Sequence, residues 1–217
     1  MQIKAAIFDF DGTIADSMPF WSDFAEKFVT HLGGTPREGL NLLVNAMSVQ
    51  EAEIYLQKEY FPEMTLEKMI EETDRYVMAR YKKGFNEKGG AGDFVRALYS
   101  RGVKMAIATA TDREPVSLAL SALGLSEYFE FIITCTDAGV GKSSSPKVFD
   151  MALGRLGAKK EECLIFEDSF YAAKTAKAAG YTVCAVYDEF SRGKKDEMQA
   201  LCNHYFDDFC KAKQELL

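Results

Sequence analysis

The pattern of apolar and polar positions divides the chain into two kinds of segment. Short apolar runs bounded by polar or glycine residues recur at 3–8, 103–109, 131–134, 163–166 and 182–187. Such runs predict strands that are buried on both faces. The segments around them show helical periodicity, at 93–100, 114–123, 146–156, 169–179, 191–201 and 208–216. This alternation predicts an α/β fold with a doubly wound parallel sheet.

Residues 15–85 have a different pattern, with helical periodicity and no strand signal. Phe20, Phe24 and Phe28 recur every four residues and so lie on one helix face. Capping-box patterns at 35–38 and 48–51, and a longer helical pattern at 65–83, predict three further helices.

The domain organisation follows from where this helical segment interrupts the sheet. We predict an α/β core from 1–14 and 86–217, with an inserted four-helix cap domain at 15–85. A glycine-rich stretch, 84–92, is typical of a return linker. The insertion follows the first strand directly, which predicts that the cap lies over the carboxyl edge of the sheet.

Charge and composition restrict the partners that we expect. The net charge of −7 provides no basic surface for nucleic acid or an anionic membrane. No apolar run approaches the length of a membrane span, and the N-terminus shows no signal-peptide pattern. Five cysteines without a C-x-x-C spacing suggest reduced thiols. We therefore expect a cytoplasmic protein; the pattern does not distinguish a monomer from a homodimer.

The first strand pattern ends in two aspartates, Asp9 and Asp11, followed by Gly12. Side chains two positions apart on a strand share a face, so these carboxylates are predicted to lie near each other. Two close carboxylates repel, and one tends to stay protonated. Because Mg2+ prefers oxygen ligands, a bound magnesium ion would remove that repulsion. Ligands of open α/β sheets bind at the carboxyl ends of strands, which is where the pair is predicted.

The sequence DFDGT at 9–13 resembles motif I of the haloacid dehalogenase (HAD) superfamily, whose members are mostly Mg2+-dependent phosphohydrolases. A bare D-x-D could also be a glycosyltransferase metal loop or a solvated turn. The rest of the chain favours the HAD resemblance, and the layout is that of the β-phosphoglucomutase-like branch with a helical cap.

Three later segments resemble the remaining HAD motifs. Thr109 matches the phosphoryl-binding Thr of motif II, and Ala110 and Thr111 after it are assigned to substrate binding. Lys142 is the preferred motif III lysine, although it stands four residues before Pro146 rather than three and Lys147 competes with it. Glu167 and Asp168 match the acidic motif IV; Ala172 stands where the family usually has glycine.

The resemblance implies a role for each matched residue. Asp9 would be the nucleophile that forms an aspartyl-phosphate, and Asp11 the general acid and base. Mg2+ would be held by Asp9, the backbone carbonyl of Asp11 and Asp168, with Glu167 acting through water. Thr109 and Lys142 would stabilise charge on the transferring phosphoryl group.

The reaction is predicted to be hydrolysis of a small phosphorylated metabolite of the sugar- or polyol-phosphate type. A sugar phosphomutase is the alternative, but Trp21 stands where the mutase pattern has histidine and Asp112 where it has lysine. A non-catalytic protein that binds a phosphorylated ligand or a partner is a further alternative. All four motifs retain a chemically competent residue, which argues against it.

The cap is predicted to contribute substrate contacts from Trp21, Asn45, Met47 and Ser48. Trp21 has two interpretations: its ring stacks on the substrate, or it packs with Phe20 and Phe24. The basic cap residues Arg37, Arg75 and Arg80 are interpreted as solvated surface.

Overall fold

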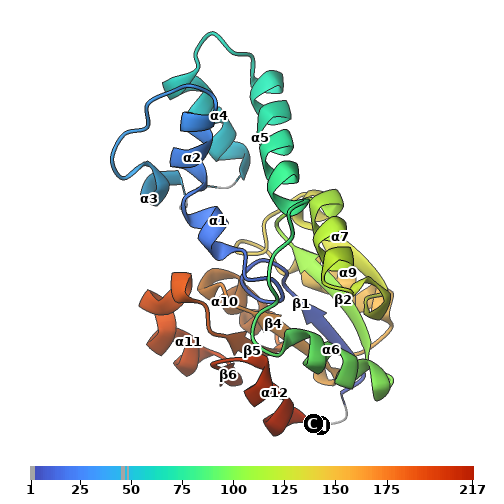
Figure 1. The fold of residues 1–217 in the computed structure, drawn as a ribbon. Helices are drawn as coiled ribbons and strands as arrows, with labels where there is room; N and C mark the ends of the chain where they lie inside the picture. The colour runs from blue at the N-terminus through green and yellow to red at the C-terminus, as the bar shows by residue number, and fades with distance from the viewer. Residues whose placement is uncertain (1–2, 45–46, 48) are drawn as a thin grey trace. The chain divides into compact units, whose positions relative to one another are not determined.

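The computed structural model describes residues 3–44, 47 and 49–217. The chain forms two compact units (Figure 1). One, the α/β unit, consists of Met1–Ser17 and Gly84–Leu217; the other, the helical unit, is Met18–Lys83.

The α/β unit is built on a six-stranded sheet whose strand pairs are all parallel. Its strand order is β3-β2-β1-β4-β5-β6. The strands are β1 (Ala5–Phe8), β2 (Lys104–Thr109), β3 (Phe131–Thr134), β4 (Cys163–Glu167), β5 (Thr182–Val186) and β6 (His204–Phe206). The doubly wound parallel sheet predicted from the sequence is confirmed.

The central strands are apolar because helices cover both faces of the sheet. Every residue of β1 is buried. The register pairs Phe8 with Ile107 on β2 and with Phe166 on β4. The rings of Phe8 and Phe166 stack with centroids 4.5 Å apart and an interplanar angle of 7°. Aromatic packing between neighbouring strands therefore fixes the register that aligns the ends of β1 and β4.

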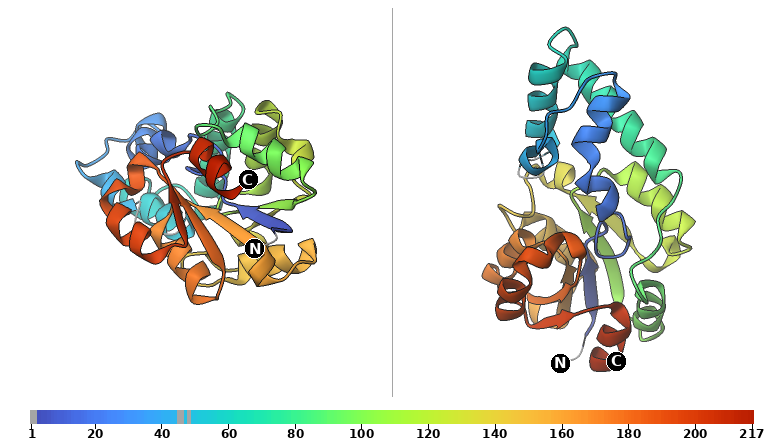
Figure 2. Two further views of the ribbon diagram at one scale, coloured as in Figure 1. Left: turned by 90° about the horizontal axis from the view of Figure 1, so that it is seen from below. Right: turned by 60° about the vertical axis from the view of Figure 1, so that its left-hand side comes forward.

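The two faces of the sheet are covered by different helices (Figure 2, left). Phe94 of α6 and Phe209 of α12 contact the Phe8 and Phe166 rings on one face. Helices α9 and α10 pack on the other. The helices of this unit are α6 (Ala91–Ser100), α7 (Arg113–Ala122), α8 (Cys135–Ala138), α9 (Lys147–Leu156), α10 (Phe170–Ala178), α11 (Lys195–Leu201) and α12 (Phe209–Leu216), with 3-10 turns at Ser126–Tyr128, Lys160–Glu162 and Glu189–Lys194.

Two elements of the α/β unit were not predicted from the sequence. Strand β6 is three residues long and only Phe206 in it is buried, so it has no apolar run; pairing with β5 creates it. Helix α8 is a single turn closed by a capping box between Thr134 and Asp137. Both depend on contacts that periodicity does not register.

The helical unit contains five helical segments within its described residues, rather than the four predicted. They are α1 (Met18–Ser22), α2 (Phe24–His31), α3 (Leu40–Val44), α4 (Val49–Tyr60) and α5 (Leu66–Tyr81). The predicted helix over the phenylalanine stripe is interrupted at Asp23, yet Phe20, Phe24 and Phe28 still pack together. Helix α5 begins after Thr65, whose side chain accepts a hydrogen bond from the Lys68 backbone N–H.

The helix predicted to begin in the capping-box pattern at 35–38 is wrong. Those residues are not helical, and α3 begins only at Leu40. The backbone N–H of Arg37 instead donates a hydrogen bond to the Tyr60 hydroxyl, and its guanidinium donates to Tyr55 and Glu59. Gly39 adopts a left-handed φ of 78°, which ends any helical path there. Ser48 of the second pattern lies outside the described residues, and α4 begins at Val49.

The helices were compared with the requirements of a membrane span. Within the part of the chain that the structure describes, none combines the length and apolarity that a span requires.

Candidate active site

The ends of β1 and β4 bring three carboxylates together. Strand β1 ends at Phe8, one residue earlier than the aspartate pair, so Asp9 lies just beyond it. The backbone N–H of Asp9 donates to the Phe166 carbonyl at 3.0 Å and ties the two strand ends together. Carboxylate oxygens of Asp9, Glu167 and Asp168 all lie within 4.8 Å of one another, and all three residues are buried. We call these residues the acidic cluster.

Lys142 is the cation of the acidic cluster. It follows α8 in the loop before α9, and it is 8% exposed. Its Nζ lies 2.5 Å from Asp9 Oδ1 and 2.6 Å from Glu167 Oε1. Its competitor, Lys147, lies in the first turn of α9 and is exposed. Of the two lysines considered from the sequence, the structure brings Lys142 to the carboxylates.

Burial and crowding raise the pKa of two carboxyl groups in the cluster. Burial is the main cause for Asp9; Lys142 opposes it, Glu167 adds to it, and the pKa of Asp9 rises to about 7. Burial, followed by the charges of Glu167 and Asp9, raises the pKa of Asp168 well above its ordinary value. Burial lowers the pKa of Lys142, but Asp9 and Glu167 outweigh it and the net shift is upward. The ammonium is therefore charged at neutral pH, and the carboxyls compete for protons.

The cluster has the composition of a site for a hard dication. Its three carboxylates, if ionised, exceed the single charge of Lys142 by two. Glu167 Oε2 accepts from the Ser169 backbone N–H at 2.9 Å. Its buried Oε1 is close to Lys142 Nζ, but it makes no hydrogen bond of acceptable geometry with the described residues. Buried carboxylate oxygens with unused lone pairs are the donors that Mg2+ and similar ions take.

Asp11 lies outside the acidic cluster and is held by hydroxyl groups. Ser17 Oγ donates to its Oδ1 at 2.6 Å and Thr111 Oγ1 to its Oδ2 at 2.7 Å. Its charge still contributes to the raised pKa of Asp9, as the smallest of the named causes. The two aspartates thus occupy different environments: one is buried beside a lysine, and the other is half-buried among hydroxyls.

The residues of the motif II segment, 109–112, differ in burial and in their hydrogen bonds. Thr109 ends β2 and is 1% exposed. Its hydroxyl accepts from the Thr111 backbone N–H at 3.1 Å, which leaves its own hydrogen to donate. Thr111 is half-buried and contacts Asp11, whereas Ala110 is exposed. Asp112 accepts a hydrogen bond from Thr136 at 3.1 Å.

Two residues of this site were missed in the sequence analysis. The buried Thr13 hydroxyl donates to Asp168 Oδ1 at 3.1 Å, and Ser17 contacts Asp11. Thr13 stands inside the motif I segment and was a detectable candidate. Ser17 carried no signal, because its contact with Asp11 follows from the turn that returns the chain at Asp11–Ala15.

Trp21 belongs to an aromatic cluster within the helical unit. Its indole N–H donates to the Tyr81 hydroxyl at 3.1 Å, and its ring lies 5.1 Å from Phe20 and 5.5 Å from Phe24. Packing accounts for these contacts; stacking on a substrate stays a prediction. Asn45 and Ser48, proposed as cap contacts, lie outside the described residues, and Met47 is half-buried.

Comparison with known proteins assigns this chain to a family. The sequence model of the family described as "Haloacid dehalogenase-like hydrolase" matches residues 6–186. Two curated relatives are a phosphorylated carbohydrates phosphatase of Thermotoga maritima and a phosphoglycolate phosphatase of Rhodospirillum rubrum. The first is 27% identical over 191 residues, covering 82% of each chain. The second is 27% identical over 217 residues, covering 95% of this chain and 88% of the relative.

The fold is shared with solved structures. The crystal structure of CbbY from Rhodobacter sphaeroides in complex with phosphate superimposes with a TM-score of 0.81 at 20% identity, over 96% of this chain and 95% of that one. The phosphatase names of the curated relatives support the predicted enzyme class, a phosphoric monoester hydrolase. With the family match spanning both units, the chain belongs to the haloacid dehalogenase-like hydrolases.

Proposed function

We propose that the protein is a Mg2+-dependent phosphatase that hydrolyses a small phosphorylated metabolite through an aspartyl-phosphate. The observation that carries this proposal is the placement of Asp9. It combines a buried carboxylate, a lysine at 2.5 Å and two further carboxylates within 4.8 Å. These are the groups that phosphoryl transfer requires, because its catalysis consists of positioning the reactants and stabilising charge.

Asp9 is the nucleophile in this mechanism. A carboxylate oxygen of Asp9 attacks phosphorus in line, the bond to the leaving oxygen breaks, and the phosphoryl group stays on Asp9. Attack requires the ionised carboxylate, although burial favours the protonated one. The Lys142 ammonium opposes that effect of burial and favours the ionised form.

Asp11 is the proton carrier. It gives a proton to the leaving oxygen in the first step. In the second step it accepts a proton from the water that attacks the aspartyl-phosphate; the bond between phosphorus and Asp9 breaks, which releases inorganic phosphate and restores the Asp9 carboxylate. Ser17 and Thr111 each donate a hydrogen bond to one oxygen of its carboxylate, which fixes the position of the carboxylate. To act as an acid, Asp11 must be protonated and turn one oxygen away from a hydroxyl partner.

Thr109 and Lys142 stabilise the transferring phosphoryl group. The Thr109 hydroxyl already accepts a hydrogen bond, so its hydrogen is free to donate to a phosphoryl oxygen. Lys142 supplies a fixed positive charge in a buried site, where an electrostatic contact is stronger than in water.

Asp9, Asp168 and Glu167 would hold Mg2+, together with the Asp11 carbonyl that the family resemblance adds. When bound, the ion supplies charge that offsets the repulsion between Asp9 and the phosphate oxygens and orients the substrate. Thr13 fixes the orientation of Asp168 through its hydrogen bond.

Net hydrolysis is favoured over the mutase alternative by two side chains. Trp21 donates its indole N–H to Tyr81 and, unlike histidine, has no group that titrates for proton transfer. Asp112 repels a second phosphate instead of binding it. The relative named for phosphorylated carbohydrates supports a sugar- or polyol-phosphate type of substrate, and the relative named for phosphoglycolate supports a small phosphorylated metabolite more generally. We further propose a cytoplasmic location.

The proposal is tested by phosphate release from para-nitrophenyl phosphate with and without chelator. We expect release with Mg2+ and its loss with excess EDTA, restored by added Mg2+. A screen of sugar and polyol phosphates then identifies the substrate. Equal rates with metal and with chelator would contradict the proposal.

Mg2+ is also expected to stabilise the fold, and more so at pH 8 than at pH 5.5. The raised pKa of Asp9 means that the folded metal-free protein holds a proton that the unfolded chain has lost. Binding of this proton stabilises the folded metal-free protein. The stabilisation is complete below the unfolded pKa of Asp9, near 3.8, and is lost as the pH rises through the folded pKa of about 7. Mg2+ replaces this proton, so the ion binds better at higher pH.

Thermal unfolding measures this effect. At roughly a hundredfold excess over its Kd, a ligand adds about 2.7 kcal/mol, which for a chain of this size is a rise in Tm of roughly 5–10 °C. Asp168→Asn should remove most of the rise. A Tm gain that is equal at both pH values, or unaffected by Asp168→Asn, would argue against the acidic cluster as the metal site.

A further inference from the structure

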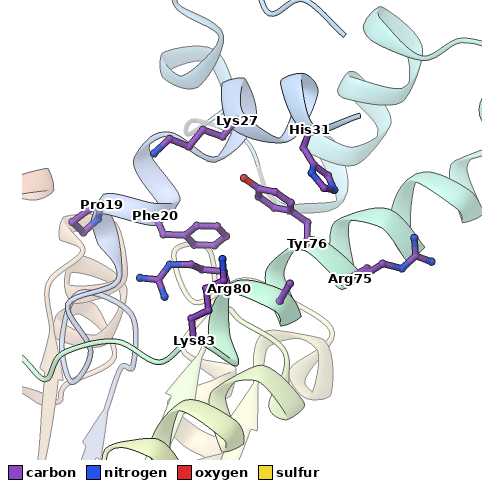
Figure 3. A pocket seen from close by; sticks show the side chains of 9 residues that line it. Pro19, Phe20, Lys27, His31, Arg75, Tyr76, Arg80 and Lys83 are labelled. Atoms are coloured by element: carbon purple, nitrogen blue, oxygen red, sulfur yellow. The ribbon is translucent and has the colours of Figure 1, made fainter. Parts of the chain in front are cut away.

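A cavity of about 590 Å³ lies within the helical unit, and no residue of the acidic cluster lines it (Figure 3). Pro19 and Phe20 of α1 and Lys27 and His31 of α2 line one side. Side chains of α5 line the other, and Lys83 follows that helix. Its volume is in the range of sites for small molecules.

The charged side chains that line this cavity are all basic. Lys27, Arg75, Arg80 and Lys83 line it together with His31, and no carboxylate is among the lining residues. This is unexpected in a chain with a net charge of −7. The cavity thus concentrates positive potential on an otherwise acidic protein, which favours an anionic ligand.

The cations are not equally engaged with carboxylates. Lys27 lies 3.0 Å from Asp23 and Arg75 lies 2.5 Å from Glu72. Lys83 is exposed and makes no ion pair within the described residues. Figure 3 shows Arg80 and Lys83 beside Phe20, whereas Arg75 extends away. Lys83 is therefore the residue best suited to meet a ligand anion.

Aromatic rings form the apolar part of the cavity. The Phe20 and Tyr76 rings lie 6.1 Å apart with an interplanar angle of 28°, and His31 lies 5.0 Å from Tyr76. The Arg80 guanidinium lies 5.9 Å from the centre of the Phe20 ring. Aromatic faces and guanidinium planes are the groups on which planar ligand rings stack.

We propose that this cavity is a second ligand site, which binds a phosphorylated small molecule with a planar ring, the chemistry of a nucleoside monophosphate. The ring packs against Phe20 and Tyr76, and the phosphate meets Lys83, Arg80 and Lys27. The lining offers no carboxylate that could act as nucleophile or metal ligand, so the site binds without catalysing hydrolysis. This inference goes beyond the proposed phosphatase function and does not rest on it.

Trp21 provides a direct readout of binding. It is the only tryptophan in the chain, and its ring lies 5.1 Å from that of Phe20. AMP titrated into the full-length Asp9→Asn variant in EDTA should change the Trp21 fluorescence, and calorimetry gives the Kd. Adenosine and inorganic phosphate should each bind at least roughly tenfold more weakly, because each lacks one half of the recognised chemistry.

Lys83→Gln should weaken AMP binding roughly tenfold, whereas Lys82→Gln should leave it unchanged. Lys82 is the matched control, since it is the neighbouring exposed lysine and does not line the cavity. Two results would overturn the proposal: no AMP binding, or binding that both variants leave intact. Binding abolished by Lys142→Gln but not by Lys83→Gln would place AMP at the acidic cluster and would overturn it as well. Because no turnover is measured, failure of AMP to bind in the cavity leaves the phosphatase proposal standing.

Discussion

Asp9→Asn is expected to abolish phosphatase activity, with kcat lowered by roughly 10⁴-fold or more. Loss of a nucleophile commonly costs this much, because the remaining groups can position the substrate but cannot form the covalent intermediate. An amide in place of the carboxylate cannot displace the leaving oxygen. The change is measured as phosphate release under saturating substrate and Mg2+, at pH 7.5.

The same variant should fold at least as well as the wild-type protein when metal is absent. Asp9 is 4% exposed beside two other acidic groups, and burial makes its charge costly. Asparagine removes that charge at almost equal volume, so the Tm in EDTA should not fall. Asp196→Asn, an exposed position in the first turn of α11, is the control and should keep full activity. If Asp9→Asn retained more than about a hundredth of the wild-type rate, Asp9 would not be the nucleophile.

Lys142→Gln should lower both activity and stability. The substitution removes the cation that lies 2.5 Å from Asp9 and 2.6 Å from Glu167. Loss of one electrostatic stabiliser of the transition state typically costs about 10²–10³ in kcat. Breaking a buried pair by removing one partner costs about 3–5 kcal/mol, because the other charge is left uncompensated. Phosphate release and urea unfolding in EDTA at pH 8 measure the two effects.

Two comparisons distinguish the specific role of Lys142 from a general loss of activity and stability caused by removing any lysine. Lys147→Gln should change neither quantity, because Lys147 is exposed in the first turn of α9. In the Asp9→Asn background, Lys142→Gln should destabilise the fold less, since one of the two unpaired carboxylates is gone. Equal losses from Lys142→Gln and Lys147→Gln, or the same stability cost in both backgrounds, would contradict the role given to Lys142.

Local periodicity was sufficient to predict the main elements of the α/β unit. The apolar runs around Ile7, Ile107 and Ile165 belong to strands whose side chains are buried on both faces, and only a parallel sheet covered by helices buries them in that way. Single-turn and edge elements were not predictable, because α8 and β6 depend on a capping pair and on a neighbouring strand. Dependence on non-local contacts also explains the wrong helix prediction at 35–38. The sequence there fits a capping box, but Arg37 forms hydrogen bonds with Tyr60 and Tyr55 instead.

The sequence by itself determined which chemical groups stand at strand ends: Asp9, Thr109, Glu167 and Asp168 each follow or end an apolar run. Parallel strands align their carboxyl ends, so the order of elements is enough to bring such residues to one edge. The tertiary structure alone decided the rest. It placed Lys142, which was already preferred from the sequence over Lys147, within contact distance of Asp9 and Glu167, because reach and burial depend on the path of the loop. It also separated Asp11 from the acidic cluster, because Ser17 and Thr111 hold it and no spacing rule encodes those distant contacts.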